Sequence, residues 1–369
     1  MKKSLITLTV MLAAAALVAV FCGSAMAKVT GSCAGCHTMH NSQDGKHMIL
    51  NTDIDGTGGP DGGGYTSLTR GTCVGCHTGD VNVGIDKNIP FVNSASEPST
   101  YLAGGNFYWV AQTTNGDAKG HNVKGIPGMT KDAVLTTAPG NPVDNPVGCD
   151  TDSCHQTLFE PADSWNLDTG CQGCHLAPKH HATQQADGAP ALEANGFFRF
   201  LSGHYTLTGD GVEGIEDDDW QFTNSATDHN EYLGKVGTHT GAGGFRGIGG
   251  NTMTAYCTGC HGNFHIQRDG STASANWIRH PSDAVLPDTG EYSVYTSYDP
   301  DVPVARPILG TGSSATVEPG TDLVMCLSCH RAHGSPNDDL LRWNYDEMVA
   351  GNAGDAADTG CFKCHSEKD

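Results

Sequence analysis

Cys326-Leu327-Ser328-Cys329-His330 is one of six copies of a Cys-x-x-Cys-His pattern, and this pattern decides how the chain can fold. The copies occupy residues 33–37, 73–77, 171–175, 257–261, 326–330 and 361–365. A seventh, stretched copy has four residues between Cys149 and Cys154 and ends at His155. Of the 15 cysteines in the 369-residue chain, only Cys22 lies outside these copies.

The pattern is the attachment sequence for c-type haem. Two cysteines about one turn apart can each form a thioether to one haem vinyl group, and the following histidine then lies under the iron. The sequence therefore predicts seven covalently bound haem c groups. The predicted thioether residues are Cys33, Cys36, Cys73, Cys76, Cys149, Cys154, Cys171, Cys174, Cys257, Cys260, Cys326, Cys329, Cys361 and Cys364. The predicted proximal ligands are His37, His77, His155, His175, His261, His330 and His365.

Two other kinds of cysteine chemistry compete with haem attachment. Zinc sites combine cysteine pairs two at a time, which an odd number of motifs fits badly. Redox disulfides within each Cys-x-x-Cys leave seven identically placed histidines without a role. Both readings are therefore disfavoured.

Eleven of the 18 histidines remain after the proximal ones, so there are enough to supply a second ligand to every iron. The predicted distal ligands are His40, His121, His180, His204, His265, His280 and His333. His47, His181, His229 and His239 are interpreted as surface or hydrogen-bonded residues, and Met39 or Met325 as a minor alternative ligand. Two imidazoles leave an iron no open position, which favours electron transfer over catalysis.

Three of the distal candidates follow a proximal histidine closely. His40 and His333 come three residues after one, and His265 comes four residues after one. Such a pair shares one face of a helical turn. The second histidine then starts on the proximal side of its own haem, so it must bind a different iron. Neighbouring porphyrins are therefore expected to lie against each other.

Residues 1–27 read as a secretory signal peptide, with Lys2 and Lys3, an apolar run and Ala25-Met26-Ala27 as the cleavage site. The mature region, residues 28–369, is expected to form one haem-binding domain without a membrane span. Its localisation is predicted as extracellular or outer cell surface, with the periplasm as the alternative. The formal net charge of −21 argues against nucleic acid or anionic membrane surfaces as partners.

Little in the rest of the chain predicts regular structure. Glycine accounts for 49 residues and hydrophobic residues for only 37%, so stacked porphyrins are expected to supply the apolar interior. The predicted fold is a multihaem cytochrome c, mostly coil with short helices wrapped around a continuous row of stacked haems. Residues 291–296 are predicted as a short strand, 300–307 as extended chain and 338–349 as a helix. The loop from Asp53 to Gly64 is read as solvated, with calcium as a weaker alternative.

Several stretches resemble a known family of outer-surface multihaem cytochromes from metal-reducing bacteria, in particular the nanowire-forming outer-membrane cytochrome S type. The matching stretches include residues 33–42, 119–122, 135–140, 279–281 and 326–333. The resemblance implies bis-histidine haems in alternating parallel and T-shaped pairs. It also implies that His40 reaches into a neighbouring copy and binds the haem at Cys326 and Cys329. The extra motif and the unmatched stretch at 176–250 are departures from the six-haem pattern.

The function predicted from these features is electron transfer, without enzyme activity. The expected partners are other copies of the chain, other multihaem cytochromes and extracellular acceptors such as metal oxides. A periplasmic electron shuttle is one alternative. A multihaem reductase with one open haem is a weaker one, because all seven motifs end in histidine.

Overall fold

The structure is a computed structural model that describes part of the chain. The described residues are 32–39, 42–43, 46–47, 68–69, 71–79, 89–112, 114–135, 138–139, 156–159, 168–175, 178, 180–181, 196–201, 211–236, 251–258, 260–261, 280–352 and 354–368. The predicted signal peptide, the stretched motif and the Asp53–Gly64 loop lie outside the described residues, as do His40, His204 and His265.

Short helical turns carry the six regular motifs. They are α2 (Cys33–Cys36), α3 (Cys73–His77), η2 (Gly170–Gly173), α4 (Met253–Cys257), η5 (Cys326–Ser328) and η9 (Gly360–Lys363). In five of them the backbone N–H of the motif histidine donates to the carbonyl of the first cysteine, at 2.8–3.1 Å. This one-turn closure places the histidine beside both sulfurs, which is the local geometry that the motif predicts.

The described strands form one five-stranded sheet and two small pairs. The sheet runs in the order β5 (Gly214–Ile215), β6 (Glu231–Leu233), β8 (Ala305–Arg306), β9 (Leu323–Val324) and β7 (Ala284–Val285). Only β6 and β8 are parallel within it. The pairs are β1 (Ser42–Gln43) with β2 (Lys46–His47) and β3 (Gln156–Thr157) with β4 (Asp168–Thr169). Every strand is two or three residues long, and the prediction of mostly coil with short helices is confirmed.

Five further 3₁₀ turns complete the described elements. They are η1 (Gly116–Lys119), η4 (Gly290–Val294), η6 (Asp338–Leu340), η7 (Tyr345–Glu347) and η8 (Gly354–Ala356). The strand predicted at 291–296 is therefore wrong, because η4 occupies it after Gly290, which has a φ of +62°. The extended chain predicted at 300–307 is found in its second half, as β8.

The helix predicted at 338–349 is also wrong, for a reason that lies in tertiary contacts. Asp339 and Leu340 have φ values of 57° and 60°, which a right-handed helix excludes. The backbone here bonds motif 326–330 instead: Arg331 N donates to the Leu340 carbonyl and Arg342 N to the Cys329 carbonyl, at 2.8 and 2.9 Å. These bonds replace the helical ones, so the apolar spacing of the segment is not expressed as a helix.

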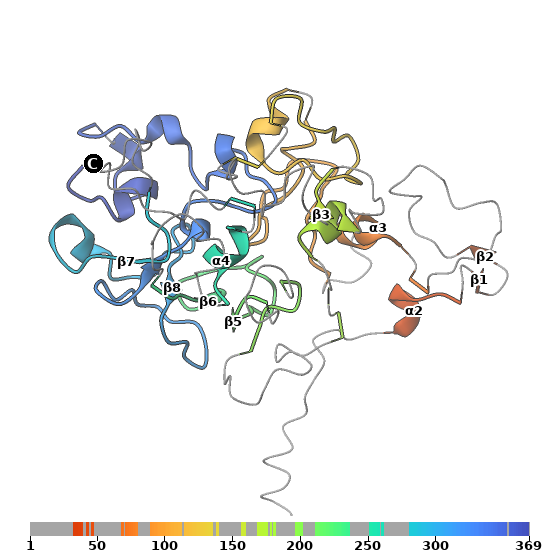
Figure 1. Cartoon of the computed structure of the whole chain (residues 1–369), viewed down its shortest axis with the longest axis horizontal. Coiled ribbons are helices and arrows are strands. Elements are labelled where there is room, and N and C mark those ends of the chain that lie inside the picture. The colour runs from red at the N-terminus through yellow and green to blue at the C-terminus, as the bar shows by residue number, and fades with distance from the viewer. Residues whose placement is uncertain are drawn as a thin grey trace, which may run out of the picture.

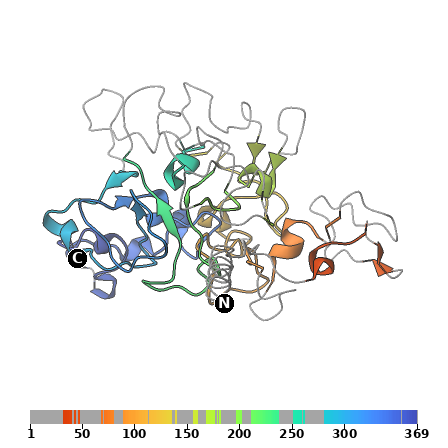
Figure 2. The same cartoon turned by 90° about the horizontal axis from the view of Figure 1, so that it is seen from below.

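The side-chain core lies mainly around the five-stranded sheet. One cluster contains Val212, Tyr232, Ala305 and Leu323, and a second includes Leu286, Tyr295 and Val304. A third, around Phe107 and Val110, supports α3 through Val74. In Figures 1 and 2 the sheet lies on the side of the molecule near the C-terminus, whereas α2, β1 and β2 lie at the opposite end.

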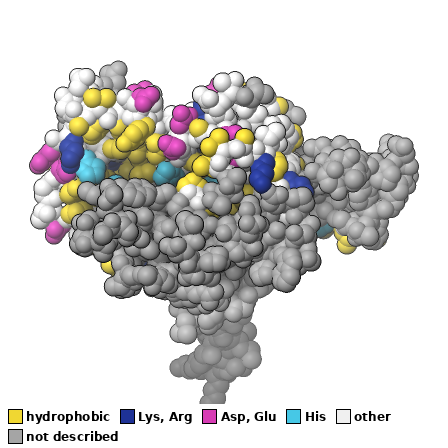
Figure 3. All heavy atoms as spheres, turned by 45° about the horizontal axis from the view of Figure 1, so that its top comes forward, with side chains coloured by type: hydrophobic (Ala, Val, Ile, Leu, Met, Phe, Trp, Pro, Cys, Tyr) yellow, Lys and Arg dark blue, Asp and Glu magenta, His cyan; other side chains and the backbone are white. Residues whose placement is uncertain are grey.

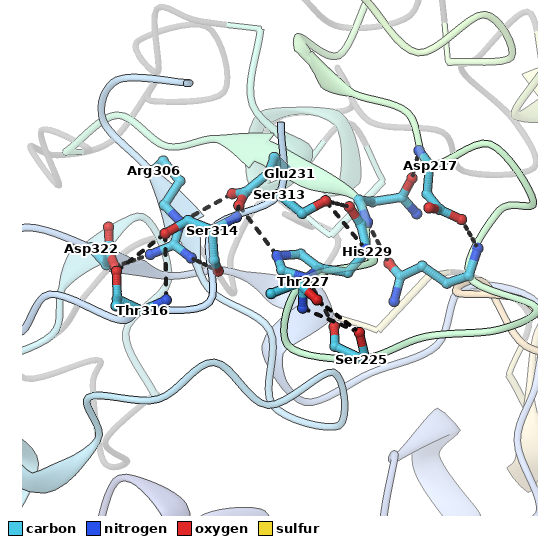
Figure 4. Close-up of polar contacts among 12 residues, drawn as sticks. Asp217, Ser225, Thr227, His229, Glu231, Arg306, Ser313, Ser314, Thr316 and Asp322 are labelled. Atoms are coloured by element: carbon cyan, nitrogen blue, oxygen red, sulfur yellow. Dashed lines mark hydrogen bonds and ion pairs between the residues drawn. The ribbon is translucent and has the colours of Figure 1, made fainter. Parts of the chain in front are cut away.

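A buried charge network ties β6 to β8 (Figure 4). The Glu231 carboxylate, 2% exposed, accepts from Arg306 Nε at 3.0 Å and from His229 Nε2 at 3.2 Å. Arg306 also pairs with Asp322. His229 is fully buried and stacks on Tyr298 with ring centroids 3.6 Å apart, so it is a hydrogen-bonded structural residue, as the sequence suggested.

Candidate haem-binding sites

The motifs define seven sites, numbered here in chain order. Sites 1, 2, 4, 5, 6 and 7 are named for the proximal histidines His37, His77, His175, His261, His330 and His365. Site 3, with Cys149, Cys154 and His155, lies outside the described residues. None of the described cysteines forms a disulfide. Within the described part of the chain, no cluster of three or more His, Cys, Asp or Glu side chains has the arrangement of a metal site.

Most of the proximal rings are oriented by a hydrogen bond from Nδ1. The acceptors are the carbonyls of Pro90 for His77, Phe200 for His175, Pro139 for His261 and Asp339 for His330, at 2.6–2.8 Å. A carbonyl can only accept, so Nδ1 carries the proton and Nε2 keeps its lone pair. This is the tautomer in which a histidine ligates a metal through Nε2.

Two predicted distal histidines have the same arrangement. His121 Nδ1 donates to the Ala332 carbonyl at 2.6 Å, and His280 Nδ1 donates to the Pro281 carbonyl at 3.0 Å. Their Nε2 atoms are therefore also free to bind.

Five proximal rings each face a second imidazole at nearly the same separation. The ring centroids are 6.0 Å apart for His37–His181, 6.1 Å for His77–His180, 6.1 Å for His175–His333, 6.0 Å for His261–His121 and 6.2 Å for His365–His280. Rings in direct stacking contact lie closer, as the 3.6 Å between His229 and Tyr298 shows.

The common separation matches a single metal ion between two rings. A metal–nitrogen bond of about 2.0 Å plus the radius of an imidazole places two opposite rings about 6 Å apart, centre to centre. With two cysteines beside each proximal histidine, the donor set is that of a covalently held haem with two axial imidazoles. The residues present therefore fit haem c.

Burial keeps most of these rings neutral near pH 7. It lowers the pKa of His77, His121, His175, His180, His280 and His330, that of His261 to about 4 and that of His333 to about 3. Iron competes with protons for the same nitrogen, so a neutral ring is the form that can ligate.

Site 6 differs from the other described sites. His330 Nδ1 donates to the Asp339 carbonyl like its counterparts, but among the described residues no second imidazole faces it. His333, only three residues later, faces His175 of site 4 and not its own site. This matches the prediction that the second histidine of a close pair turns toward a different site.

Contacts between motifs join the described sites into one row. Sites 1 and 2 are neighbours because their second rings belong to the adjacent residues His180 and His181. Sites 2 and 4 meet where the Cys73 and Cys171 side chains lie beside each other. The Tyr256 hydroxyl on α4 donates to the Cys174 carbonyl, which brings site 5 against site 4.

The row continues toward the C-terminus. Sites 5 and 6 meet where the Cys326 sulfur lies 3.8 Å from the Thr254 hydroxyl of α4. Arg342 N donates to the Cys329 carbonyl at 2.9 Å, and the next residue, Trp343, packs against the same cluster as Cys364, which places site 7 beside site 6. On the face of the molecule that Figure 3 views, histidine side chains lie among apolar ones.

The sequence identified most of these rings, with one omission. Of the predicted distal ligands, His121, His180, His280 and His333 each face a proximal ring. His181, interpreted from the sequence as an ordinary residue, faces His37 instead. Its position directly after His180 could have indicated this role, since two adjacent histidines can face the proximal rings of two neighbouring sites.

Comparisons with known proteins find the same motif and similar cytochromes. Residues 319–369 match the family model described as the doubled CXXCH motif. The chain is 28% identical over 363 residues to C-type cytochrome OmcS of Geobacter sulfurreducens, covering 85% of this chain and 78% of that protein.

Two solved structures are also similar. The outer membrane cytochrome S filament from Geobacter sulfurreducens matches with a TM-score of 0.50 and 23% identity, covering 86% of this chain and 85% of that chain. A cryo-EM structure of the OmcS nanowires matches with a TM-score of 0.44 and 22% identity, covering 89% and 88%. The predicted resemblance to OmcS-type multihaem cytochromes is confirmed, and covalent binding of haem c is supported with it.

Proposed function

We propose that the chain is a secreted c-type cytochrome with seven haems that carries electrons to extracellular acceptors as the subunit of a filament. The observation that carries this proposal is the row of five imidazole pairs, each about 6 Å apart and each beside a Cys-x-x-Cys turn. Haem held in this way undergoes one-electron oxidation and reduction, and two imidazoles on each iron leave no position for a substrate.

The protein's part in this function is to hold and space the haem groups. The cysteines would tether them, and the paired histidines would supply both axial nitrogens. Carbonyl acceptors fix the ring orientations at four of the proximal histidines, and burial excludes protons from the ligating nitrogens. Residues 28–369 would act as one unit, because contacts between motifs join site 1 to site 7.

Similarity to OmcS supports the filament and its extracellular location. Site 6 is the place where a filament would complete a ligand set, since no described imidazole faces His330. In the proposed assembly His40 of one copy binds the iron at site 6 of the next. A subunit outside a filament would then have one iron with an open position.

The experiment compares the wild-type protein with His40→Ala, and with His47→Ala as a control lacking a different histidine of the same segment. Cryo-electron microscopy of material sheared from cells should show fibres for the wild type and for His47→Ala, but none for His40→Ala. The EPR spectrum of oxidised His40→Ala should gain one high-spin iron, whereas wild-type fibres should be entirely low-spin. Fibres that still form with His40→Ala would contradict the proposed assembly. A high-spin iron in wild-type fibres would favour a reductase.

A further inference from the structure

His365 at site 7 has a different hydrogen-bond partner from the other proximal histidines. Its Nδ1 lies 3.2 Å from Oε1 of Glu291, a carboxylate. The corresponding atoms of His77, His175, His261 and His330 face neutral backbone carbonyls. Site 7 is therefore the site, among these five, where a negative charge lies directly behind the ligating ring.

Several contacts hold the carboxylate in this place. Glu291 is the second residue of η4, and its own carbonyl accepts from Ser366 Oγ at 2.7 Å, which fixes this turn to the residue after the ligand. Its side chain is 12% exposed and forms an ion pair with Lys368. The Tyr292 ring meets the His365 ring edge-on at 5.2 Å and limits its rotation.

The direction of the hydrogen bond follows from the ligand role. With Nε2 on iron, a neutral imidazole keeps its proton on Nδ1 and needs an acceptor there. Glu291, ionised near pH 7 and paired with a cation, can only accept. Lys368 Nζ lies 3.2 Å from the same Nδ1 but has only protons to donate, so its proximity is explained by its ion pair with Glu291.

Resting on the function proposed above, we propose that Glu291 positions His365 and lowers the reduction potential of the site 7 haem relative to the carbonyl-bonded sites. A carboxylate draws the Nδ1 proton more strongly than a carbonyl does, which makes the ring a better electron donor to iron. A stronger donor stabilises the oxidised iron, and hydrogen bonding around the ligand is an established means of tuning such potentials. Lys368 partly offsets the carboxylate charge and so limits the effect.

The reduction potentials along the row of sites would then be unequal. Site 7 joins the row through site 6, because Arg342 N bonds the Cys329 carbonyl and the next residue, Trp343, packs against the same cluster as Cys364. The haem at site 7 would be harder to reduce than the haems at the carbonyl-bonded sites, and it would be oxidised first. Electrons would then rest on the sites with carbonyl acceptors, away from this end of the chain.

The test is redox titration of the secreted holoprotein followed by EPR. The site 7 rings are nearly perpendicular, at 83°, against 15–60° for the other four pairs, and perpendicular axial rings give a more anisotropic low-spin signal. Glu291→Gln should raise the midpoint of this signal and leave the others in place. Lys368→Met should lower the same midpoint. Glu347→Gln removes an equal charge from exposed η7, where the carboxylate contacts Asn344, and should shift no midpoint.

Different results would contradict the proposed function and the role of Glu291. Intact mass reports how many haems each variant carries. If site 7 of the wild type carries no haem, the proposed function is wrong. If the haem is present in all variants and Glu291→Gln and Lys368→Met leave its midpoint unchanged, or both shift it in one direction, the role assigned to Glu291 is wrong. Should Glu291→Gln fail to mature, Lys368→Met still decides the question.

Discussion

The sheet-bearing region at 211–236 and 280–352 and the N-terminal arm at 32–39 and 68–79 carry the same haem motif on very different supports. Around the sheet, η5 buries Leu327 and Ser328, and Leu327 belongs to the same core cluster as fully buried Leu323. In the arm, α2 has no buried residue and α3 buries only Val74. The α2 motif therefore forms without buried side chains, and α3 has only Val74 packed in the Phe107–Val110 cluster, so in the arm the haem groups are expected to supply most of the apolar interior.

The largest effect expected from this difference is on the haem-free chain. Without covalent haem, for instance in a host lacking the attachment machinery, residues 32–39 and 68–79 should lose their amide protection, because Val74 is the only buried residue of α2 and α3. Residues 280–352 should retain measurable protection, since their clusters consist of side chains. Hydrogen exchange measured by mass spectrometry checks this, and equal loss of protection in both segments would contradict it.

The charge network of the sheet should produce the next largest effect. Glu231→Gln leaves Arg306 and His229 buried beside a neutral group, and breaking a buried pair in this way costs about 3–5 kcal/mol. The loss should appear as a lower unfolding midpoint of the sheet region, with the haem count unchanged. Glu318→Gln, the same substitution at an exposed position between β8 and β9, should change stability by no more than about 0.5 kcal/mol. A similar loss in both variants would show that the network has no special role.

The sequence indicates where the candidate sites lie along the chain but not which of them are neighbours, and this difference has a physical cause. The chemistry of haem attachment needs only neighbouring residues, so a five-residue motif such as Cys171 to His175 predicts an attachment site wherever it occurs. The ring pairs join residues far apart, as in His37–His181 and His175–His333, across glycine-rich loops without periodicity. Only the four- or three-residue spacing after a motif indicated that a ring such as His333 serves another site.

The failed helix at 338–349 has a related cause. Its apolar spacing is helical, but its backbone is used to hold motif 326–330, with the Asp339 carbonyl orienting His330. That contact cannot be seen in a local pattern, because it links two segments through a ligand. Secondary structure in this chain is subordinate to the geometry of the sites.

Removing the N-cap threonine of α3 or of α4 should cause the smallest loss of stability. The two substitutions compare the arm directly with the sheet region. Thr72 caps α3 in the arm through Gly75 N at 3.2 Å, and Thr252 caps α4 beside the sheet through Ala255 N at 3.1 Å. Removing either cap with alanine should cost about 1 kcal/mol. Thr252→Ala should cost about 1–2 kcal/mol more, because the fully buried hydroxyl also donates to Asp283. Thermal unfolding of the two holoprotein variants measures the difference, and equal losses would mean that the sheet region gives its motif no added support.

The central claim is that iron porphyrins held by cysteine pairs form the interior along the row of imidazole pairs. Mass spectrometry of the intact purified protein tests this directly. We expect the mass of residues 28–369 plus seven haem groups, with every motif modified after digestion. An unmodified polypeptide, or unmodified cysteines at any of the six sites with described geometry, would contradict it.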